Sequence, residues 1–342
     1  MDLTQRKEQV LKAVVEGYIA SGEPVGSKTL QNDLFSDVSS ATIRNDMADL
    51  TVKGYLSQPH TSAGRVPSQR GYRYYVERLM SRNKLSPRIT EYIEEKLIQS
   101  ADTPENILKK STQVLSEVTG VASIASTPSG ERARVHKVRF VQTGRQTAMA
   151  VLICSTGMVK TKLFRCDFVI TSEALNIFDK ALNSLLSGME LARITQPFIQ
   201  TVAASFGEMA LYMPSVLIAV MEASKEALKS EITVSGQTNI LSLPDISVNA
   251  AAQMLRFLSS KREIASLLCE KPNGTAVYIG EETGRQELYQ SSVIITHYEI
   301  SGQTAGEIAL LGSVRMDYKN CIGCLEYTAD VAGQLIEQLV AS

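Results

Sequence analysis

The sequence predicts an α+β protein built from several domains, and three observations support this fold class. The chain has 342 residues, 44% hydrophobic and 21% charged, which is an ordinary globular composition with enough length for two or three cores. Short helical patterns followed by a hairpin pattern occupy the first 76 residues. Between about 170 and 268 the composition shifts to Ala, Leu, Met and Ser at helical spacing, with strand patterns on both sides.

Composition also excludes several classes of protein. No run approaches the roughly 18 uncharged apolar residues of a membrane helix, and the start MDLTQRKEQ lacks the apolar stretch of a signal peptide. We therefore expect a cytoplasmic protein with no membrane partner. Five cysteines, an odd number, favour reduced thiols over a disulfide framework.

Charge is distributed unevenly along the chain. The formal net charge is −1, which gives no sign of a polyanionic partner for the chain as a whole. From residue 42 to residue 82, however, seven basic residues stand against three acidic ones. A nearly neutral chain thus carries a basic patch close to its N-terminus.

Three short helices are predicted within the first fifty residues. Residues 4–21 place apolar side chains at helical spacing, and Gly22 ends this first pattern. A second helix can begin at Ser27, and either Ser39 or Ser40 can cap a third. The arrangement is typical of a helix-turn-helix.

The third helix has one apolar face. Ile43, Met47 and Leu50 recur at positions i, i+4 and i+7, so they must pack against the first two helices. The remaining side chains near the N-terminus then point outward: Ser40, Thr42, Arg44 and Asn45.

A β-hairpin is predicted directly after the third helix. Gly54 ends that helix, residues 55–57 begin an extended segment, and the chain turns at 62–64 and returns at 65–67. Three helices followed by a basic two-stranded wing form the layout of a winged helix-turn-helix. Such a third helix can enter a DNA major groove while arginines of the wing neutralise phosphates.

These positions predict two kinds of DNA contact. Arginine matches guanine, asparagine matches adenine, and hydroxyls serve either base, so the outward residues of the third helix are assigned to base edges or nearby phosphates. Ser39 and the helix N-terminus would hold a phosphate through backbone N–H groups. The remaining backbone contacts are assigned to His60, Thr61, Ser62, Arg65, Arg70 and Arg73.

The rest of the chain predicts a mixed architecture. Residues 87–125 are predicted to be helical, and a long helix is predicted from about Tyr318 to Leu339. Strands are predicted at 135–141, 148–153, 159–164, 232–234, 276–279, 293–298 and 308–314. The two adjacent carboxylates after Gly280 cannot act on one substrate, because adjacent strand residues point to opposite faces. We therefore interpret this segment as a solvated turn.

Two local features have competing interpretations. Tyr72, Tyr74 and Tyr75 can pack at the junction between wing and next domain, which we favour, or stack on bases. Cys321 and Cys324 form a lone C-x-x-C inside a helical pattern, where they are predicted to pack as small apolar residues. The competing hypothesis is a thiol redox protein, which requires a depressed thiol pKa.

No catalytic site is evident. The three histidines stand apart at 60, 136 and 297, and no nucleophile motif or phosphate loop occurs in a fitting context. We therefore expect no enzymatic activity, no cofactor and no metal.

Two long motifs and a later block resemble a known family. SSATIRNDMADL at 39–50 and PHTSAGRVPSQRGYRYYV at 59–76 resemble the heat-inducible transcription repressor HrcA. SSVIITHY at 291–298 and GEIALLGSVRMDY at 306–318 resemble a later block of the same family. The similarity therefore spans nearly the whole chain.

The resemblance implies a three-domain organisation. It comprises a winged helix at 1–76, a discontinuous GAF-like α/β domain at 77–169 and 269–342, and an inserted, mainly helical dimerisation domain at 170–268. It also implies a homodimer that represses chaperone operons by binding an inverted-repeat operator in double-stranded DNA, with the chaperonin GroEL supporting its activity. The alternative is a winged-helix regulator controlled by a small ligand in its GAF-like domain.

Overall fold

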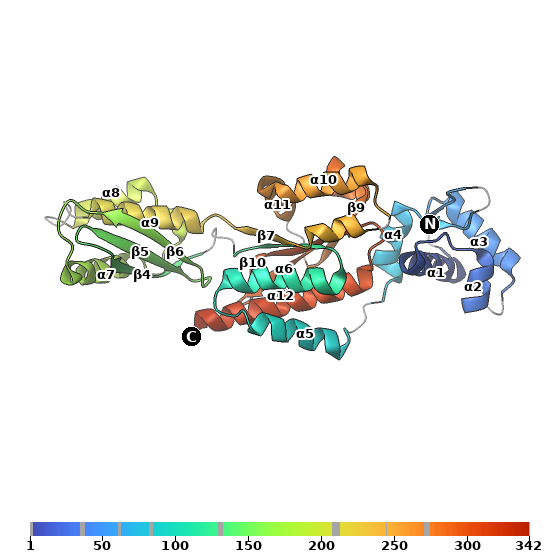
Figure 1. The fold of residues 1–342 in the computed structure, drawn as a ribbon, viewed down its shortest axis with the longest axis horizontal. Coiled ribbons are helices and arrows are strands. Elements are labelled where there is room, and N and C mark those ends of the chain that lie inside the picture. Colours follow the sequence, from blue (N-terminus) through green and yellow to red (C-terminus); the bar gives the residue numbers. More distant parts are fainter. Residues whose placement is uncertain are drawn as a thin grey trace.

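Three groups of elements follow one another along the long axis of the molecule in the computed structural model (Figure 1). The structure describes residues 3–34, 38–60, 63–81, 85–128, 133–206, 213–243, 245–269 and 274–341. We call residues 3–81 the N-terminal unit, 133–228 the distal unit, and the remaining described residues the central unit. The N-terminal and distal units lie at opposite ends (Figure 1).

The N-terminal unit begins with three helices and a hairpin, as predicted, and adds two short helices after them. Its elements are α1 (Gln5–Ser21), α2 (Ser27–Leu34), α3 (Ser40–Val52), β1 (Leu56–Ser57), β2 (Val66–Pro67), α4 (Gln69–Tyr74) and the π-helix η1 (Tyr75–Leu79). Gly22 ends α1 in the left-handed conformation, with φ of 75°, and its N–H donates to Tyr18 O. Strands β1 and β2 pair antiparallel.

The central unit is an antiparallel five-stranded sheet between two helical layers. The strand order is β7-β3-β10-β9-β8, with bounds β3 Ala122–Ser126, β7 Ile232–Ser235, β8 Ala276–Ile279, β9 Ser291–Ile300 and β10 Gln303–Ser313. The helices are α5 (Pro87–Ile98), α6 (Pro104–Thr119), α10 (Val248–Ser259), α11 (Lys261–Leu268) and α12 (Tyr318–Ala341). Short 3-10 turns are η5 (Gln237–Ser242), η6 (Gly280–Thr283) and η7 (Gln286–Leu288).

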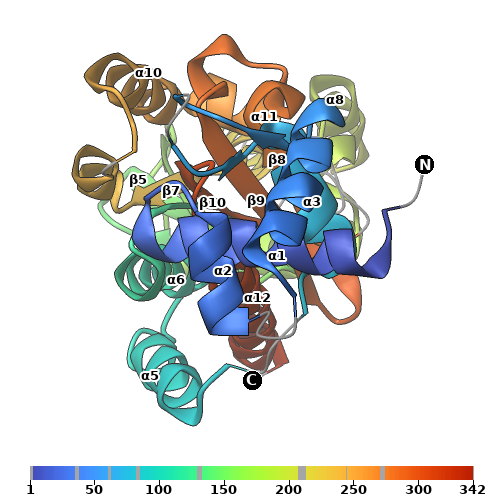
Figure 2. The same ribbon diagram turned by 90° about the vertical axis from the view of Figure 1, so that its right-hand side faces the viewer.

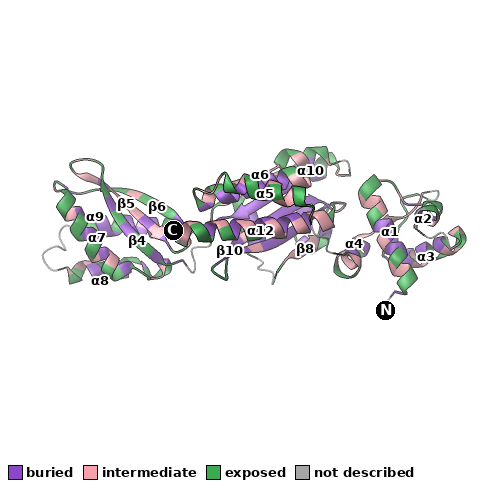
Figure 3. Ribbon diagram, turned by 90° about the horizontal axis from the view of Figure 1, so that it is seen from below, coloured by how far each residue is buried: buried purple, intermediate pink, exposed green. Residues whose placement is uncertain are grey.

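Alternation along β10 separates two apolar cores. Ile308 and Leu310 join the core that includes α5, α6 and α12, whereas Ala309 and Leu311 join the core that includes α10 and α11. The sheet is therefore buried on both faces (Figure 3).

The distal unit has its own three-stranded sheet and its own core. Strands β4 (Val135–Gln142), β5 (Thr147–Cys154) and β6 (Val159–Arg165) form an antiparallel meander. Helices α7 (Ser172–Leu186), α8 (Gln196–Ser205) and α9 (Pro214–Ala227), with the turn η3 (Leu191–Arg193), contribute to the same core. One face of the sheet is thus covered by helices of the same unit.

The packing differs from the predicted division in two places. The strands at 135–165 share a core with α7–α9, although the prediction assigned them to the same domain as the C-terminal strands. Helices α10 and α11 pack on the central sheet, although they were assigned to the inserted segment 170–268. The prediction that 87–125 is entirely helical is also wrong, because the last residues of that segment form β3.

The N-terminal unit shares one continuous apolar core with the central unit. Side chains of α1 and α3 belong to the same buried cluster as α6, α12 and the inner face of the sheet. Tyr72 and Tyr75 are 1% and 2% exposed, and Tyr72 packs on Tyr318 with ring centroids 5.9 Å apart. The prediction of packing at the junction is confirmed for Tyr72, and Tyr75 is buried in the same core. Tyr74 packs within the N-terminal unit, partly buried against Tyr55.

Replacing Tyr72 by phenylalanine is expected to raise the free energy of unfolding by about 1 kcal/mol, as measured by urea denaturation. The buried Tyr72 hydroxyl has no hydrogen-bond partner among the described residues, so its removal loses no bond. Tyr318→Phe is the matched control. The Tyr318 hydroxyl donates to Val314 O at 2.7 Å, so its removal breaks a hydrogen bond and should lower the free energy of unfolding. Equal destabilisation by both changes would contradict this account.

Candidate nucleic-acid interface

The first turn of α3 is held by a side-chain cap. Ser39 has an extended backbone, and its Oγ accepts a hydrogen bond from the N–H of Thr42 at 3.1 Å. The Ser39 and Thr42 hydroxyl oxygens also lie 2.9 Å apart. Of the two serines predicted to cap the helix, Ser39 does so, and Ser40 is the first helical residue.

Burial of one side of α3 exposes the other side. Ile43, Met47 and Leu50 are 0%, 3% and 0% exposed, which confirms the predicted inner face. Arg44 and Asn45 are exposed, and Ser40 and Thr42 are partly exposed. Seen along the long axis, the helices of the N-terminal unit lie in front of the rest of the molecule (Figure 2).

Two alanines widen this outward face. Ala41 and Ala48 are both exposed and lie at helical spacing from Arg44 and Asn45. Small side chains there allow another surface to approach the helix backbone closely. Hydrogen-bonding capacity does not mark these alanines in the sequence, whereas their i, i+3, i+7 spacing on the outward face does.

The acidic residues of α3 turn toward α1 and away from this face. Asp46 is 4% exposed, and its carboxylate pairs with Arg6, with Nε to Oδ2 at 2.6 Å. Asp49 accepts from Lys7 at 2.5 Å and lies 2.9 Å from the Lys53 ammonium. These hydrogen bonds lower the pKa of the Asp49 carboxyl. Because both carboxylates are already paired, they do not oppose an anion at the outer face.

The hairpin lies against the start of α2. Arg65 and Val25 exchange two backbone hydrogen bonds, at 2.9 and 2.8 Å. A Cβ on Gly64 would lie 2.4 Å from Val25 O, so only glycine fits at this approach. A hollow of about 520 Å³ lies between these elements and α3, lined by Val25, Gly26, Ser27, Arg44, Met47, Gln58, Ala63, Gly64 and Arg65.

The structure brings some of the predicted wing residues together near α3. Arg65 is partly exposed and its Nε donates to Thr51 Oγ1 at 3.0 Å, so it lines the hollow beside Arg44. Arg70 is exposed, stacks 4.6 Å from the ring centroid of Tyr55, and donates to Lys53 O. His60 is exposed. Thr61 and Ser62 lie outside the described residues.

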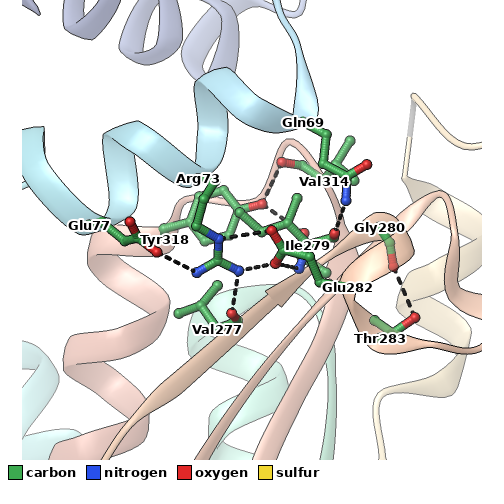
Figure 4. Close-up of polar contacts among 11 residues, drawn as sticks. Gln69, Arg73, Glu77, Val277, Ile279, Gly280, Glu282, Thr283, Val314 and Tyr318 are labelled. Carbon is green, nitrogen blue, oxygen red and sulfur yellow. Dashed lines mark hydrogen bonds and ion pairs between the residues drawn. The ribbon is translucent and has the colours of Figure 1, made fainter. Parts of the chain in front are cut away.

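Arg73 lies elsewhere, and its assignment to a DNA backbone contact is corrected. Its guanidinium donates to Val277 O at 2.6 Å and pairs with Glu282, on the central unit (Figure 4). A group that is partly buried between two units cannot also reach a phosphate on the outer face. The segment after Gly280 is a 3-10 turn with both glutamates exposed, as predicted, but the sequence did not reveal that Glu282 also pairs with Arg73.

The two cysteines of the C-x-x-C motif are buried, as predicted. Cys321 and Cys324 are 1% and 0% exposed on α12. Burial raises the pKa of the Cys324 thiol to about 11 and raises that of Cys321 as well. The redox hypothesis required depressed thiol pKa values, so the structure contradicts it.

Neither a metal-binding cluster nor a membrane-spanning helix occurs among the described residues. Within the described ranges, no group of three or more His, Cys, Asp or Glu side chains is arranged to hold a metal ion. Among the helices in those ranges, none combines the length and apolarity that crossing a bilayer would need.

Comparison with known proteins identifies relatives of the whole chain. The heat-inducible transcription repressor HrcA of Moorella thermoacetica is 35% identical over 347 residues and covers 99% of both chains. That of Desulforudis audaxviator is 33% identical over 351 residues, with the same coverage. The family model of the HrcA protein C-terminal domain matches residues 105–322.

One solved structure shares the fold over its full length. A crystal structure described as a hypothetical protein at 2.2 Å resolution superposes with a TM-score of 0.69 at 22% identity, covering 99% of this chain and all of the other. The repressor relatives and the family model place the molecule in the class of transcription repressors. The chain belongs to the heat-inducible transcription repressor HrcA family, which confirms the resemblance noted in the sequence.

Proposed function

We propose that this protein is a sequence-specific DNA-binding repressor of heat-shock chaperone operons, with the N-terminal unit acting as a winged helix. The observation that carries the proposal is the outward face of α3, where Arg44 and Asn45 stand exposed beside the hollow formed with the hairpin. An exposed helix N-terminus with arginine and asparagine suits a major groove, and the hairpin suits the adjacent phosphates. Such activity belongs in the cytoplasm.

The proposal is tested by fluorescence anisotropy with an inverted repeat taken from upstream of a chaperonin operon. Specific binding should exceed binding to a scrambled duplex by about 10³-fold or more at fixed salt. Equal affinity for the two duplexes would contradict sequence-specific repression. Repeating the titration with added GroEL, and after mild heating, tests the chaperonin dependence, which is supported by family membership alone.

A homodimer through the distal unit forms part of the proposal. The outer face of its sheet presents Val141, Val159 and Leu163, which are 48%, 48% and 64% exposed. Val141, Met149 and Leu163 form one row across the three strands, and Ile153 pairs with Val159 in another row. The same face also carries Lys137 and Arg139 on β4, so its apolar rows are bordered by charge. An exposed sheet face with apolar rows suits a second copy of the same chain.

We accordingly infer domain boundaries that differ from the predicted ones. The inserted dimerisation domain is taken as residues 133–228, because these residues share one core. The GAF-like domain is then 85–128 together with 229–341, whose strands and helices surround the five-stranded sheet.

Arg65→Ala is expected to weaken operator binding with little change in sequence preference. The Arg65 guanidinium borders the hollow beside Arg44 and is placed to meet a phosphate. Because a dimer would lose two phosphate contacts, the slope of log affinity against log salt should flatten by about two units. Arg193, 74% exposed in the distal unit, provides the control change Arg193→Ala, which should leave the slope unaltered. An unchanged slope for Arg65→Ala would remove this residue from the interface.

A regulator controlled by a small ligand is the second candidate, favoured by one hollow in the central unit. This hollow of about 520 Å³ lies between β9 and α12 and is lined by Thr296, His297, Glu299, Glu326, Asp330 and Glu337, among others. Burial and the neighbouring Glu326 and Glu299 raise the pKa of Asp330, which suits a cationic ligand. This candidate requires that a cationic ligand raise the thermal midpoint and change operator affinity.

A further inference from the structure

We propose that Arg73 and Arg315 are positioning residues that set the angle between the N-terminal unit and the central unit, and that binding to a complete inverted repeat depends on this angle. The inference rests on the proposed function as a dimeric DNA-binding repressor. We call the contacts that Gln69, Arg73 and Arg315 make across this boundary, with Glu282 as the partner of Arg73, the junction clamp.

Arg73 reaches from α4 into the central unit. Its Nε donates to Glu282 Oε1 at 2.9 Å, and its Nη2 donates to both Val277 O and the second carboxylate oxygen of Glu282 (Figure 4). Glu282 is itself oriented, because its Oε2 accepts from the N–H of Ile279 at 2.8 Å. Gln69, one turn earlier, donates to Ile279 O. A bidentate pair with an anchored carboxylate holds a guanidinium in one geometry.

Arg315 reaches in the opposite direction, from the central unit to the end of α1. Its Nη1 donates to Tyr18 O at 3.3 Å and lies 3.5 Å from Ile19 O, and its guanidinium stands 5.9 Å from the Tyr18 ring centroid. The last turn of α1 contains no basic residue, so the central unit supplies the cation that its exposed carbonyls favour. Asp245 lies 3.8 Å from Arg315 Nε.

These contacts are better placed to define an angle than ordinary surface ion pairs. The side chains of Arg73 and Arg315 are only 25% and 13% exposed, so solvent screens them less than a fully exposed pair. The Tyr72 and Tyr318 rings add an apolar contact at the same boundary. Two arginines acting from opposite sides, together with a packed ring pair, restrict rotation of one unit on the other.

A defined angle matters only when both subunits bind at once. Once one N-terminal unit has bound its half-site, a freely rotating second unit would be present at a lower effective concentration at the other half-site, and affinity for the inverted repeat would fall. Affinity for a single half-site would not change. Disrupting the junction clamp should therefore lower affinity for the inverted repeat and leave affinity for a single half-site unchanged.

The test compares full-length wild type, R73E, E282R and R73E/E282R on two duplexes, one with the inverted repeat and one with a single half-site. R73E places a carboxylate opposite Glu282, and we expect affinity for the inverted repeat to fall about 10-fold or more while half-site affinity changes less than about 2-fold. The double variant restores the pair with reversed charges and should recover most of the lost affinity. E282R alone should resemble R73E.

Other outcomes overturn the proposal. An equal loss on both duplexes without recovery in the double variant would return Arg73 to the role of a phosphate contact, and an unchanged affinity in all variants would exclude an orienting role. R315M supplies an independent variant should R73E fold poorly, since its thermal unfolding can be compared with wild type and it should show the same confined loss.

A distance measurement separates failure of the clamp from failure of the proposed function. Nitroxide labels at the exposed positions Asn32 and Glu263, in a chain with Cys269→Ser, report the relative placement of the two units without DNA. The distance distribution should be narrow in wild type and R73E/E282R and broad in R73E. If wild type binds neither duplex but the distance distributions differ between variants in this way, the proposed function is wrong while the orienting role of the junction clamp is supported. Identical narrow distributions in all variants would overturn the clamp.

Discussion

Leu163→Arg is expected to convert the protein to monomers and to lower affinity for the inverted repeat by about 100-fold or more. Leu163 is 64% exposed on β6, in one row with Met149 and Val141 on the outer face of the distal sheet. A charge buried against a second apolar sheet without a partner costs several kcal/mol. Loss of the dimer also removes simultaneous binding of two half-sites, which alone is worth about 10² to 10⁴ in affinity.

Sedimentation velocity measures the first effect and anisotropy the second. Ile177→Glu is the matched control, because Ile177 is 50% exposed on α7, whose buried residues belong to the core on the inner side of the same sheet. We expect this variant to remain dimeric. A dimeric Leu163→Arg protein together with a monomeric Ile177→Glu protein would move the subunit interface to the helical side of the unit.

Arg44→Ala is expected to cost about 1–3 kcal/mol of operator affinity for each half-site, with relaxed preference at one base pair. Arg44 is exposed at the N-terminal end of α3, while Asp46 and Asp49, the acidic residues nearest to it on the helix, are paired with α1. An arginine free of a carboxylate partner on its own helix can donate to guanine O6 and N7. Its loss then weakens the preferred sequence more than others.

Competition binding against single-base variants of the operator measures this preference. The matched control is Arg193→Ala in the distal unit, where the side chain is 74% exposed, because that unit and α3 lie at opposite ends of the long axis (Figure 1). Equal weakening by Arg44→Ala on operator and unrelated DNA would reassign Arg44 to a phosphate contact.

Periodicity predicted most elements of the fold because their two faces differ. The inner residues of α3 and the strands of the distal sheet show helical spacing or alternation that follows their burial. Strand β3 was missed because all five of its residues are buried, so no alternation marks it within a segment of helical patterns. The observed packing differs from the predicted division because a pattern indicates a strand without indicating the sheet to which the strand belongs.

The candidate site shows the same division between local and distant information. The outward residues of α3 followed from spacing alone, since a helix buries one face and exposes the other. Arg73 was misassigned because its main partner, Glu282, lies 209 positions away in the sequence. A count of local charges cannot detect a carboxylate that only the folded chain brings near. The pairing of Asp46 with Arg6 escaped notice for the same reason.

The separation of the N-terminal and distal units has a mechanical consequence. The outer sheet face proposed for pairing and the helix proposed for contacting bases lie at opposite ends of the long axis (Figure 1). In the proposed dimer, the orientation of each N-terminal unit on its central unit would therefore set where the two copies of α3 lie relative to each other.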